Sequence, residues 1–207
     1  MITIEPFLPE YTNDLYSITL ATGASGSNGA HLYGDSKLIG HIYSGPYAAL
    51  EPSLVLLVMD DKGVAGYVLG ATDTPAWEKR LEREWWPKLR VKYPDPHDLP
   101  PEEWTQDHRG MYMIHHPPRV PSAVSGPYPA HLHMNLLPRA QGAGIGSRLF
   151  DAWLELIAPH SPTGVHVGVD PHNERGIRFW SRSGFRELTL PTEQSDQTLW
   201  MGQKLPR

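Results

Sequence analysis

Three glycines alternate with other residues in LLPRAQGAGIGSRLFDAWLELI, residues 136–157. Gly142, Gly144 and Gly146 lie between an apolar run typical of a strand and a sequence with the apolar spacing of an amphipathic helix. Backbone N–H groups at a helix N-terminus attract anions, helped by the helix dipole, and glycine lets a ligand approach the backbone closely. The segment therefore predicts a phosphate-binding loop, with a simple capped turn between strand and helix as the alternative.

Two common phosphate-binding motifs do not fit this segment. The nucleoside-triphosphate loop GxxxxGK[ST] needs a lysine after its last glycine, and none follows a glycine here. The dinucleotide motif GxGxxG needs glycine where Ser147 stands, directly after a buried strand, whereas residues 138–141 intervene. We expect the contacts to phosphate to come instead from Gln141, Gly142, Ala143, Gly144, Ile145, Gly146 and Ser147.

The pattern Q-x-x-G-x-G after a strand resembles the pyrophosphate loop of the GCN5-related N-acetyltransferases (GNATs). A second stretch, GVHVGVDPHNERGIRFWSRSGFREL at 164–188, resembles the later part of the same fold. The resemblance implies an α/β GNAT fold, with a mixed, mostly antiparallel sheet, splayed central strands and flanking helices. It also implies acetyl-CoA as co-substrate, its pantetheine arm pairing with the backbone of Leu136 and Leu137 and bonded by Asn173.

The resemblance extends over nearly the whole chain. LYSITLATG (15–23), DDKGVAGYVLGATDT (60–74) and YPAHLHMNLLPRAQG (128–142) are similar to the C-terminal acetyltransferase-like domain of O-GlcNAcase, and more so to its free-standing bacterial relatives. We therefore expect one domain over 1–207, with an insertion at about 74–127. The glycosidase domain of O-GlcNAcase has no counterpart here, so nothing about sugar hydrolysis carries over.

Acetyl transfer to a primary amine needs a base, a donor for the oxyanion and often an acid for the departing thiolate. The resemblance places Trp180 where the family commonly has a tyrosine acid. An indole N–H donates a hydrogen bond but does not release its proton at neutral pH. Two functions stay open: an N-acetyltransferase acting on an unknown amine, and a catalytically weak or inactive acyl-CoA-binding or interaction module. Trp180 could equally pack beside the cofactor.

Histidines of the strand expected at 130–137 are the candidate bases. His131 and His133 share one face, and an ordinary pKa near 6.5 suits proton transfer. A half-buried, hydrogen-bonded role is the alternative for both. His115 and His116 could line the acceptor side. The H-x-H pair lacks third and fourth ligands at metal-site spacing, so no metal is expected. Arg139, beside the loop, could meet a phosphate or lie on the surface.

Composition excludes several classes of protein. The 207 residues carry a net charge of −5, which gives no basic field for nucleic acid, and no cysteine. The N-terminal sequence lacks a secretory pattern, and no apolar stretch approaches the roughly 20 residues of a membrane span. We expect a cytoplasmic protein that binds neither nucleic acid nor membrane. Seven tryptophans suggest a possible homodimer interface.

Apolar periodicity and turn residues predict the remaining elements. The expected helices cover 10–21, 35–43, a Trp-rich stretch from 74 to 93, a piece near 101–114, the stretch after the glycine loop up to Ile157, and 173–183. Thr74 is the expected N-cap of the Trp-rich helix, which Pro87 ends or kinks. The expected strands are 2–6, 54–61, 64–72, 130–137, 164–170, 185–190 and 197–204.

Overall fold

A seven-stranded sheet forms the centre of the computed structural model, which describes residues 2–24, 26–190 and 198–206. Its spatial order is β1-β2-β3-β4-β5-β7-β6, and every neighbouring pair is antiparallel except β4–β5. The expected mixed, mostly antiparallel sheet is confirmed. The strands are β1 Thr3–Pro6, β2 Leu56–Asp60, β3 Gly63–Ala71, β4 Ala130–Leu136, β5 Gly164–Val169, β6 Arg186–Glu187 and β7 Leu199–Lys204.

The parallel pair β4–β5 is joined only at its first residues. Ala130 pairs with Val165 and His131 with His166, and no later residue of β4 pairs with β5. On its other edge, β4 pairs with β3 from His131 to Leu136. One edge of β4 is therefore open beyond His131, and the expected splay of the two central strands is confirmed.

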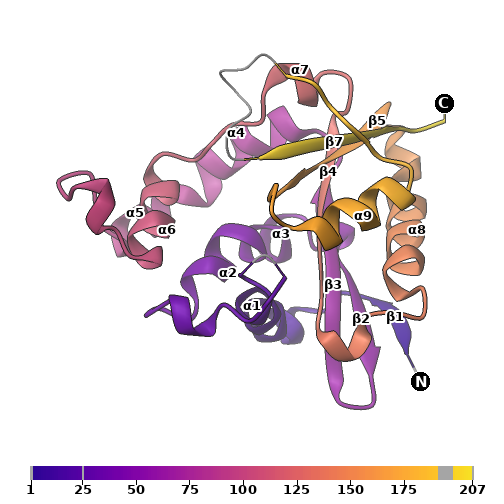
Figure 1. Ribbon diagram of the computed structural model, residues 1–207, viewed down its shortest axis with the longest axis horizontal. Helices are drawn as coiled ribbons and strands as arrows, with labels where there is room; N and C mark the ends of the chain where they lie inside the picture. The colour runs from indigo at the N-terminus through magenta and orange to yellow at the C-terminus, as the bar shows by residue number, and fades with distance from the viewer. Residues whose placement is uncertain (1, 25, 191–197, 207) are drawn as a thin grey trace.

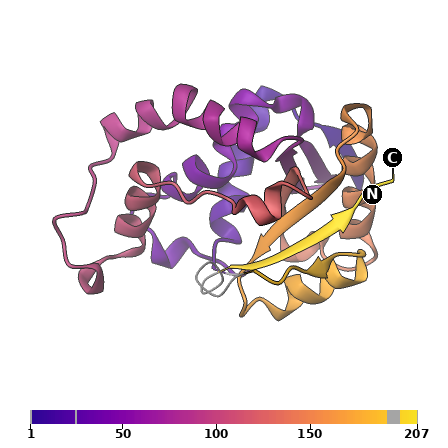
Figure 2. The same ribbon diagram turned by 90° about the horizontal axis from the view of Figure 1, so that it is seen from above.

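Helices cover both faces of the sheet (Figure 1). On one face, α1, α2 and α3 pack over the core that contains Leu57 and Leu69, and on the other, α8 and α9 share a core with Val68 and Val165. The longer segment between β3 and β4 carries α4 to α7 and extends away from α8 (Figures 1 and 2). The helices are α1 Thr12–Ala21, α2 Leu38–Tyr43, α3 Gly45–Leu50, α4 Thr74–Glu84, α5 Trp86–Lys92, α6 Gln106–His115, α7 Ser122–Ser125, α8 Ile145–Ile157 and α9 Glu174–Arg182.

Short 3-10 turns connect several of these elements. They cover Pro9–Tyr11, Ala30–Leu32, Pro52–Leu54, Pro101–Glu103, Pro138–Ala140 and Ala158–His160. Helices α3 and α7 were not expected from the sequence. The strand expected at 185–190 is shorter, β6, and of the strand expected at 197–204, residue 197 lies outside the described residues. Among the described helices, none combines the length and apolar character needed to cross a bilayer.

The N-cap of the Trp-rich helix lies one residue earlier than the sequence suggests. Asp73, not Thr74, is the N-cap, because its carboxylate accepts the N–H of Ala76 at 2.9 Å. The prediction for Thr74 was wrong by one position, since the Thr74 hydroxyl donates instead to the carbonyl of Pro129 at 2.7 Å. The expected break is confirmed: α4 ends before Trp85, and Pro87 stands in the first turn of α5.

Candidate functional site

The glycine loop (residues 141–147) has an unusual backbone. Gly142, Ala143 and Gly144 adopt φ values of 84°, 47° and 72°, three successive left-handed residues immediately before α8. A Cβ placed on Gly142 or Gly144 would project into open space. In the first turn of α8, the N–H of Ile145 donates to the carbonyl of Gly142 at 3.2 Å, whereas those of Gly146 and Ser147 have no acceptor among the described residues. The loop therefore presents backbone amides to its surroundings without side chains in front of them, which is the geometry of an anion nest.

A large cleft of about 1170 Å³ opens beside this loop. Met134 and Asn135 of β4 line it on one side, and the start of α9 lines it on another. Of the residues expected to bind a cofactor, the cleft is lined by Leu136, Gln141, Gly142, Gly144, Ile145, Gly146, Ser147, Asn173 and Trp180. Ala143 lies within the loop but does not line the cleft. The structure thus brings together two segments that the sequence placed some thirty residues apart.

The open edge of β4 faces this gap. Leu137 donates its N–H to the carbonyl of Ala65 in β3, at 2.8 Å. Since N–H directions alternate along a strand, those of Leu136 and Met134 point to the opposite edge, toward β5. The carbonyl of Leu136 accepts from the side-chain amide of Gln141 at 2.7 Å. The N–H of Leu137 therefore pairs with β3 and does not face the gap, contrary to the expectation for this residue. The N–H of Met134, which the sequence reasoning did not name, faces the gap together with that of Leu136.

Arg139 is held away from the large cleft. Its Nε donates to the carboxylate of Asp60 and its Nη2 to the carbonyl of Val64, both at 2.7 Å. The hydrogen bond from Arg139 lowers the pKa of Asp60. Arg139 is absent from the cleft lining, so the structure does not place it at a phosphate site. The reason is the competing carboxylate on the β2–β3 hairpin.

The α9 side of the cleft carries the two other expected residues. Asn173 caps α9: its Oδ1 accepts the N–H of Gly176 at 2.9 Å, which leaves its side-chain NH₂ to donate to a ligand. Trp180 is 8% exposed, and its ring packs edge to face on Phe150 and Phe185, with centroids 5.7 and 5.0 Å away. Trp180 is thus a packing aromatic of the core that also borders the cleft.

His131 is fully engaged in hydrogen bonds. Its Nδ1 lies 2.7 Å from the hydroxyl of Thr74 and its Nε2 2.6 Å from that of Tyr47. The hydroxyl of Thr74 donates its one hydrogen to the carbonyl of Pro129 and can therefore only accept from His131. Nδ1 of His131 thus carries the ring hydrogen, and its Nε2 accepts from the hydroxyl of Tyr47. Burial holds the pKa of His131 well below its usual value, so the ring is neutral. Both nitrogens are occupied, and neither is available to a substrate.

His133 differs from His131 although both lie on the same face of β4. It is only partly buried, its ring lies 6.0 Å from that of Tyr43 and 5.7 Å from that of Tyr47, and its nitrogens form no hydrogen bond with another described residue. Burial lowers the pKa of His133 to about 4. At neutral pH the ring is uncharged and has a free lone pair that can accept a proton.

A third histidine, His166 of β5, joins this group from across the sheet and was not singled out in the sequence. It is 1% exposed, its Nδ1 donates to the carbonyl of Tyr128 at 2.6 Å, and its ring centroid lies 5.7 Å from that of His131. Burial lowers the pKa of His166 to about 4. The strand alternation predicted only its neighbouring valines to be buried, because packing on the second face is decided by distant helices.

A small pocket of about 140 Å³ lies beside β4. His133 lines the small pocket, and the next two residues, Met134 and Asn135, line the large cleft. Its polar lining also includes Tyr43, Glu78, Glu82 and Arg119. Its apolar walls are Ile42, Leu81, Trp86, Met113, Pro117 and Pro118. Glu78 and Tyr43 were missed at the sequence level, since nothing local indicates that α4 and α2 meet beside β4.

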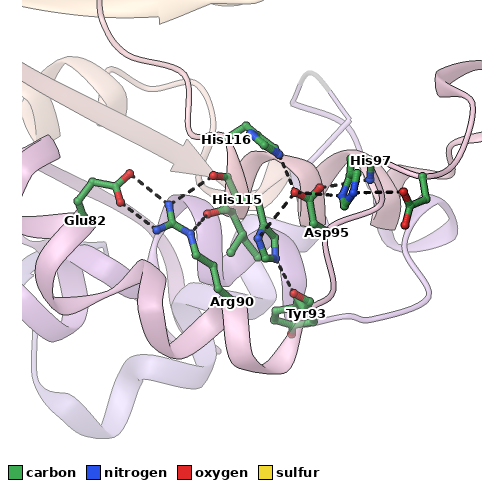
Figure 3. Close-up of polar contacts among 9 residues, drawn as sticks. Glu82, Arg90, Tyr93, Asp95, His97, His115 and His116 are labelled. Carbon is green, nitrogen blue, oxygen red and sulfur yellow. Dashed lines mark hydrogen bonds and ion pairs between the residues drawn. The ribbon is translucent and has the colours of Figure 1, made fainter.

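His115 and His116 do not line either hollow. Figure 3 shows their contacts: His116 Nε2 lies 2.7 Å from the carboxylate of Asp95, and His115 Nε2 lies 2.7 Å from the carbonyl of Tyr93. They instead fix the chain that leads into Pro117, a wall of the small pocket. Within the part of the chain that the structure describes, no group of three His, Cys, Asp or Glu side chains has the arrangement of a metal site.

Comparison with solved structures finds the same architecture in acetyltransferases. The crystal structure of SsHAT has a TM-score of 0.87 at 29% identity, with 98% of both chains covered. PaiA N-acetyltransferase from Thermoplasma acidophilum, solved in complex with coenzyme A, has a TM-score of 0.56 at 13% identity, with 99% of each chain covered. This chain has the GNAT fold of these acetyltransferases.

The O-GlcNAcase relationship rests on sequence. Rat O-GlcNAcase is 22% identical over 187 residues, which are 90% of this GNAT-fold chain and 20% of the rat protein; the mouse protein matches equally. The chain therefore spans about a fifth of the length of these curated relatives. No protein-family model matches it. In this GNAT fold, the splay of β4 and β5 and the glycine loop occupy neighbouring positions, as the resemblance implied.

Proposed function

We propose that this protein is an acetyl-CoA-dependent N-acetyltransferase that acts on a primary amine. The observation that carries the proposal is that consecutive residues of β4 line the two hollows: His133 lines the small pocket, and Met134 lines the large cleft that contains the anion nest. A coenzyme A pyrophosphate fits the amides of the glycine loop. A pantetheine arm fits the open edge of β4 at Leu136 and Met134, and it could accept from the side-chain NH₂ of Asn173.

His133 is the proposed general base. The amine nitrogen bonds to the thioester carbon, the C–S bond breaks, and the coenzyme A thiolate leaves, while a proton of the attacking nitrogen passes to the ring of His133. His133 suits this step better than His131, because its nitrogens have no competing partner among the described residues. Its pKa of about 4 keeps the ring neutral at pH 7 and makes it a weaker base than an ordinary histidine. His131 is instead a positioning residue, because it accepts from Tyr47, whose ring packs near His133.

A second candidate function is a catalytically weak or inactive acyl-CoA-binding module. Trp180 favours it, because the indole in the position of the usual tyrosine cannot protonate a leaving thiolate. Loss of a general acid typically costs about 10²–10⁴-fold in rate. The cleft would then bind the same ligand without efficient turnover.

Ligand-dependent melting tests the shared part of both candidates. Coenzyme A or acetyl-CoA at about 100 times its Kd stabilises the fold by about 2.7 kcal/mol, whereas NAD and ATP leave it unchanged. Following thiol release against a panel of primary amines separates the candidates: turnover with any amine supports the transferase, and tight binding with a flat response supports the module. A cytoplasmic location and a homodimer remain predictions, the latter open to light scattering.

A further inference from the structure

The small pocket is lined by two carboxylates, Glu78 and Glu82, of which only Glu82 forms an ion pair among the described residues. Glu82 forms a two-pronged ion pair with Arg90, at 3.0 and 3.2 Å, and Arg90 also donates to the carbonyl of Ile114 at 2.9 Å (Figure 3). The charge of Glu82 is thus balanced inside the wall that it forms. Since Arg90 joins α5 to the end of α6, this pair acts as a structural clamp on the pocket.

Glu78, one turn earlier on α4, has no such cation. Its Oε1 accepts the N–H of Val120 at 2.8 Å, and it forms no ion pair with any described residue. Arg119 lines the same pocket but is exposed and does not pair with it among the described contacts. Glu78 therefore presents an unbalanced negative charge to a pocket whose remaining walls are largely apolar.

The far wall of the pocket is held in place by side chains outside it. In Figure 3, His115 and His116 reach back to Tyr93 and Asp95 from the end of α6. The segment that follows, Pro117 to Arg119, closes the pocket over α4. Pro117 and Pro118 restrict the backbone of this segment, which keeps this wall of the pocket in place.

We propose that the small pocket receives the acetyl acceptor, and that the acceptor is an unbranched aliphatic primary amine bound as its ammonium ion by Glu78. This inference rests on the proposed function and narrows its substrate. A volume of about 140 Å³ holds roughly four or five water molecules at about 30 Å³ each, which matches a four- or five-carbon amine. A hexosamine ring is bulkier and carries several hydroxyl groups, for which the mostly apolar walls offer few hydrogen-bond partners.

Glu78 and His133 have separate parts in this arrangement. Glu78 attracts the ammonium ion through its carboxylate. The bound ammonium first passes one proton to solvent water, and the neutral nitrogen then bonds to the acetyl carbon. His133 takes a second proton from that nitrogen, the C–S bond breaks, and coenzyme A leaves as its thiolate. Glu78 is thus a specificity-determining residue, and its removal acts on amine binding more than on the chemical step.

The test uses Glu78→Gln, whose amide oxygen still accepts from Val120 but carries no charge. Glu155→Gln, an exposed residue of α8 that packs on the other face of the sheet, is the matched control. Binding of n-butylamine to the full chain saturated with coenzyme A is measured by calorimetry, with glucosamine as the comparison ligand. We expect butylamine to bind, glucosamine not to bind, and Glu78→Gln to weaken butylamine about 10–100-fold. Glu155→Gln should be unchanged.

The same variants separate this inference from the function it rests on. In turnover with acetyl-CoA, Glu78→Gln should raise KM for butylamine by that factor and change kcat less. Tighter binding of glucosamine than of butylamine, or equal butylamine binding by Glu78→Gln and wild type, overturns the assignment of the pocket. Butylamine binding without thiol release from wild type overturns the transferase function and leaves the pocket assignment supported.

Discussion

Replacing Gly144 by glutamate probes the anion nest directly. Gly144 has φ 72°, and a side chain there projects into open space beside the large cleft. A residue other than glycine in the left-handed region costs roughly 1–2 kcal/mol. For a chain of this size each kcal/mol lowers Tm by about 2–4 °C, so we expect a fall of about 2–8 °C in the unliganded protein.

The effect on ligand binding should be much larger. A glutamate in the nest displaces hydrogen bonds from backbone N–H groups to a charged phosphate, each worth about 1.5–3 kcal/mol. Its own charge repels a phosphate at about 4 Å by about 1 kcal/mol in water, and by more where water is excluded. With two donors lost, the cost is about 4 kcal/mol or more, equivalent to about a thousandfold in Kd.

Gly63→Glu is the matched control for strain. Gly63 has φ 99°, is the first residue of β3, where a Cβ would meet open space, and does not line the large cleft. Calorimetric titration with coenzyme A and melting curves are measured for both variants. Both should melt earlier by similar amounts, and only Gly144→Glu should lose coenzyme A affinity. Near-wild-type affinity in Gly144→Glu, or an equal loss in Gly63→Glu, would refute the anion nest.

Three further predictions concern the aromatic and histidine groups. Trp180→Tyr should raise the rate of thiol release about 10²-fold or more by supplying an acid, while Trp180→Phe should not; equal rates in both would show that the leaving thiolate needs no acid. His133→Ala should lower kcat about 10²–10⁴-fold while leaving the affinity for coenzyme A unchanged. In the wild type, kcat should fall with decreasing pH around pH 4, where His133 becomes protonated; a fall centred at pH 6.5 would contradict this assignment. In the folded state the pKa values of His131, His133 and His166 lie below the unfolded value of 6.5. The neutral rings therefore stabilise the fold above pH 6.5, and this stabilisation is lost as the pH falls toward 4. The free energy of unfolding in urea should decrease from pH 7 to 6 to 5, and a constant value would count against neutral buried rings.

Much of the fold was open to prediction because it depends on local patterns. Alternating apolar residues place β3, β4 and β5 within a few residues of their observed bounds. The glycine loop was also predictable, since left-handed backbone and close ligand approach both require glycine. These signals lie within one turn or one strand, and the residues that carry them are neighbours in the chain.

The roles of individual site residues were decided by tertiary structure. His131 and His133 have the same type and share a strand face, yet Tyr47 and Thr74, 84 and 57 residues away in the sequence, occupy both nitrogens of only one of them. Arg139 likewise lies beside the loop but pairs with Asp60, 79 residues away. A local pattern determines which way a side chain points from its own backbone. Its burial, partners and pKa depend on distant segments that meet it only in the folded chain.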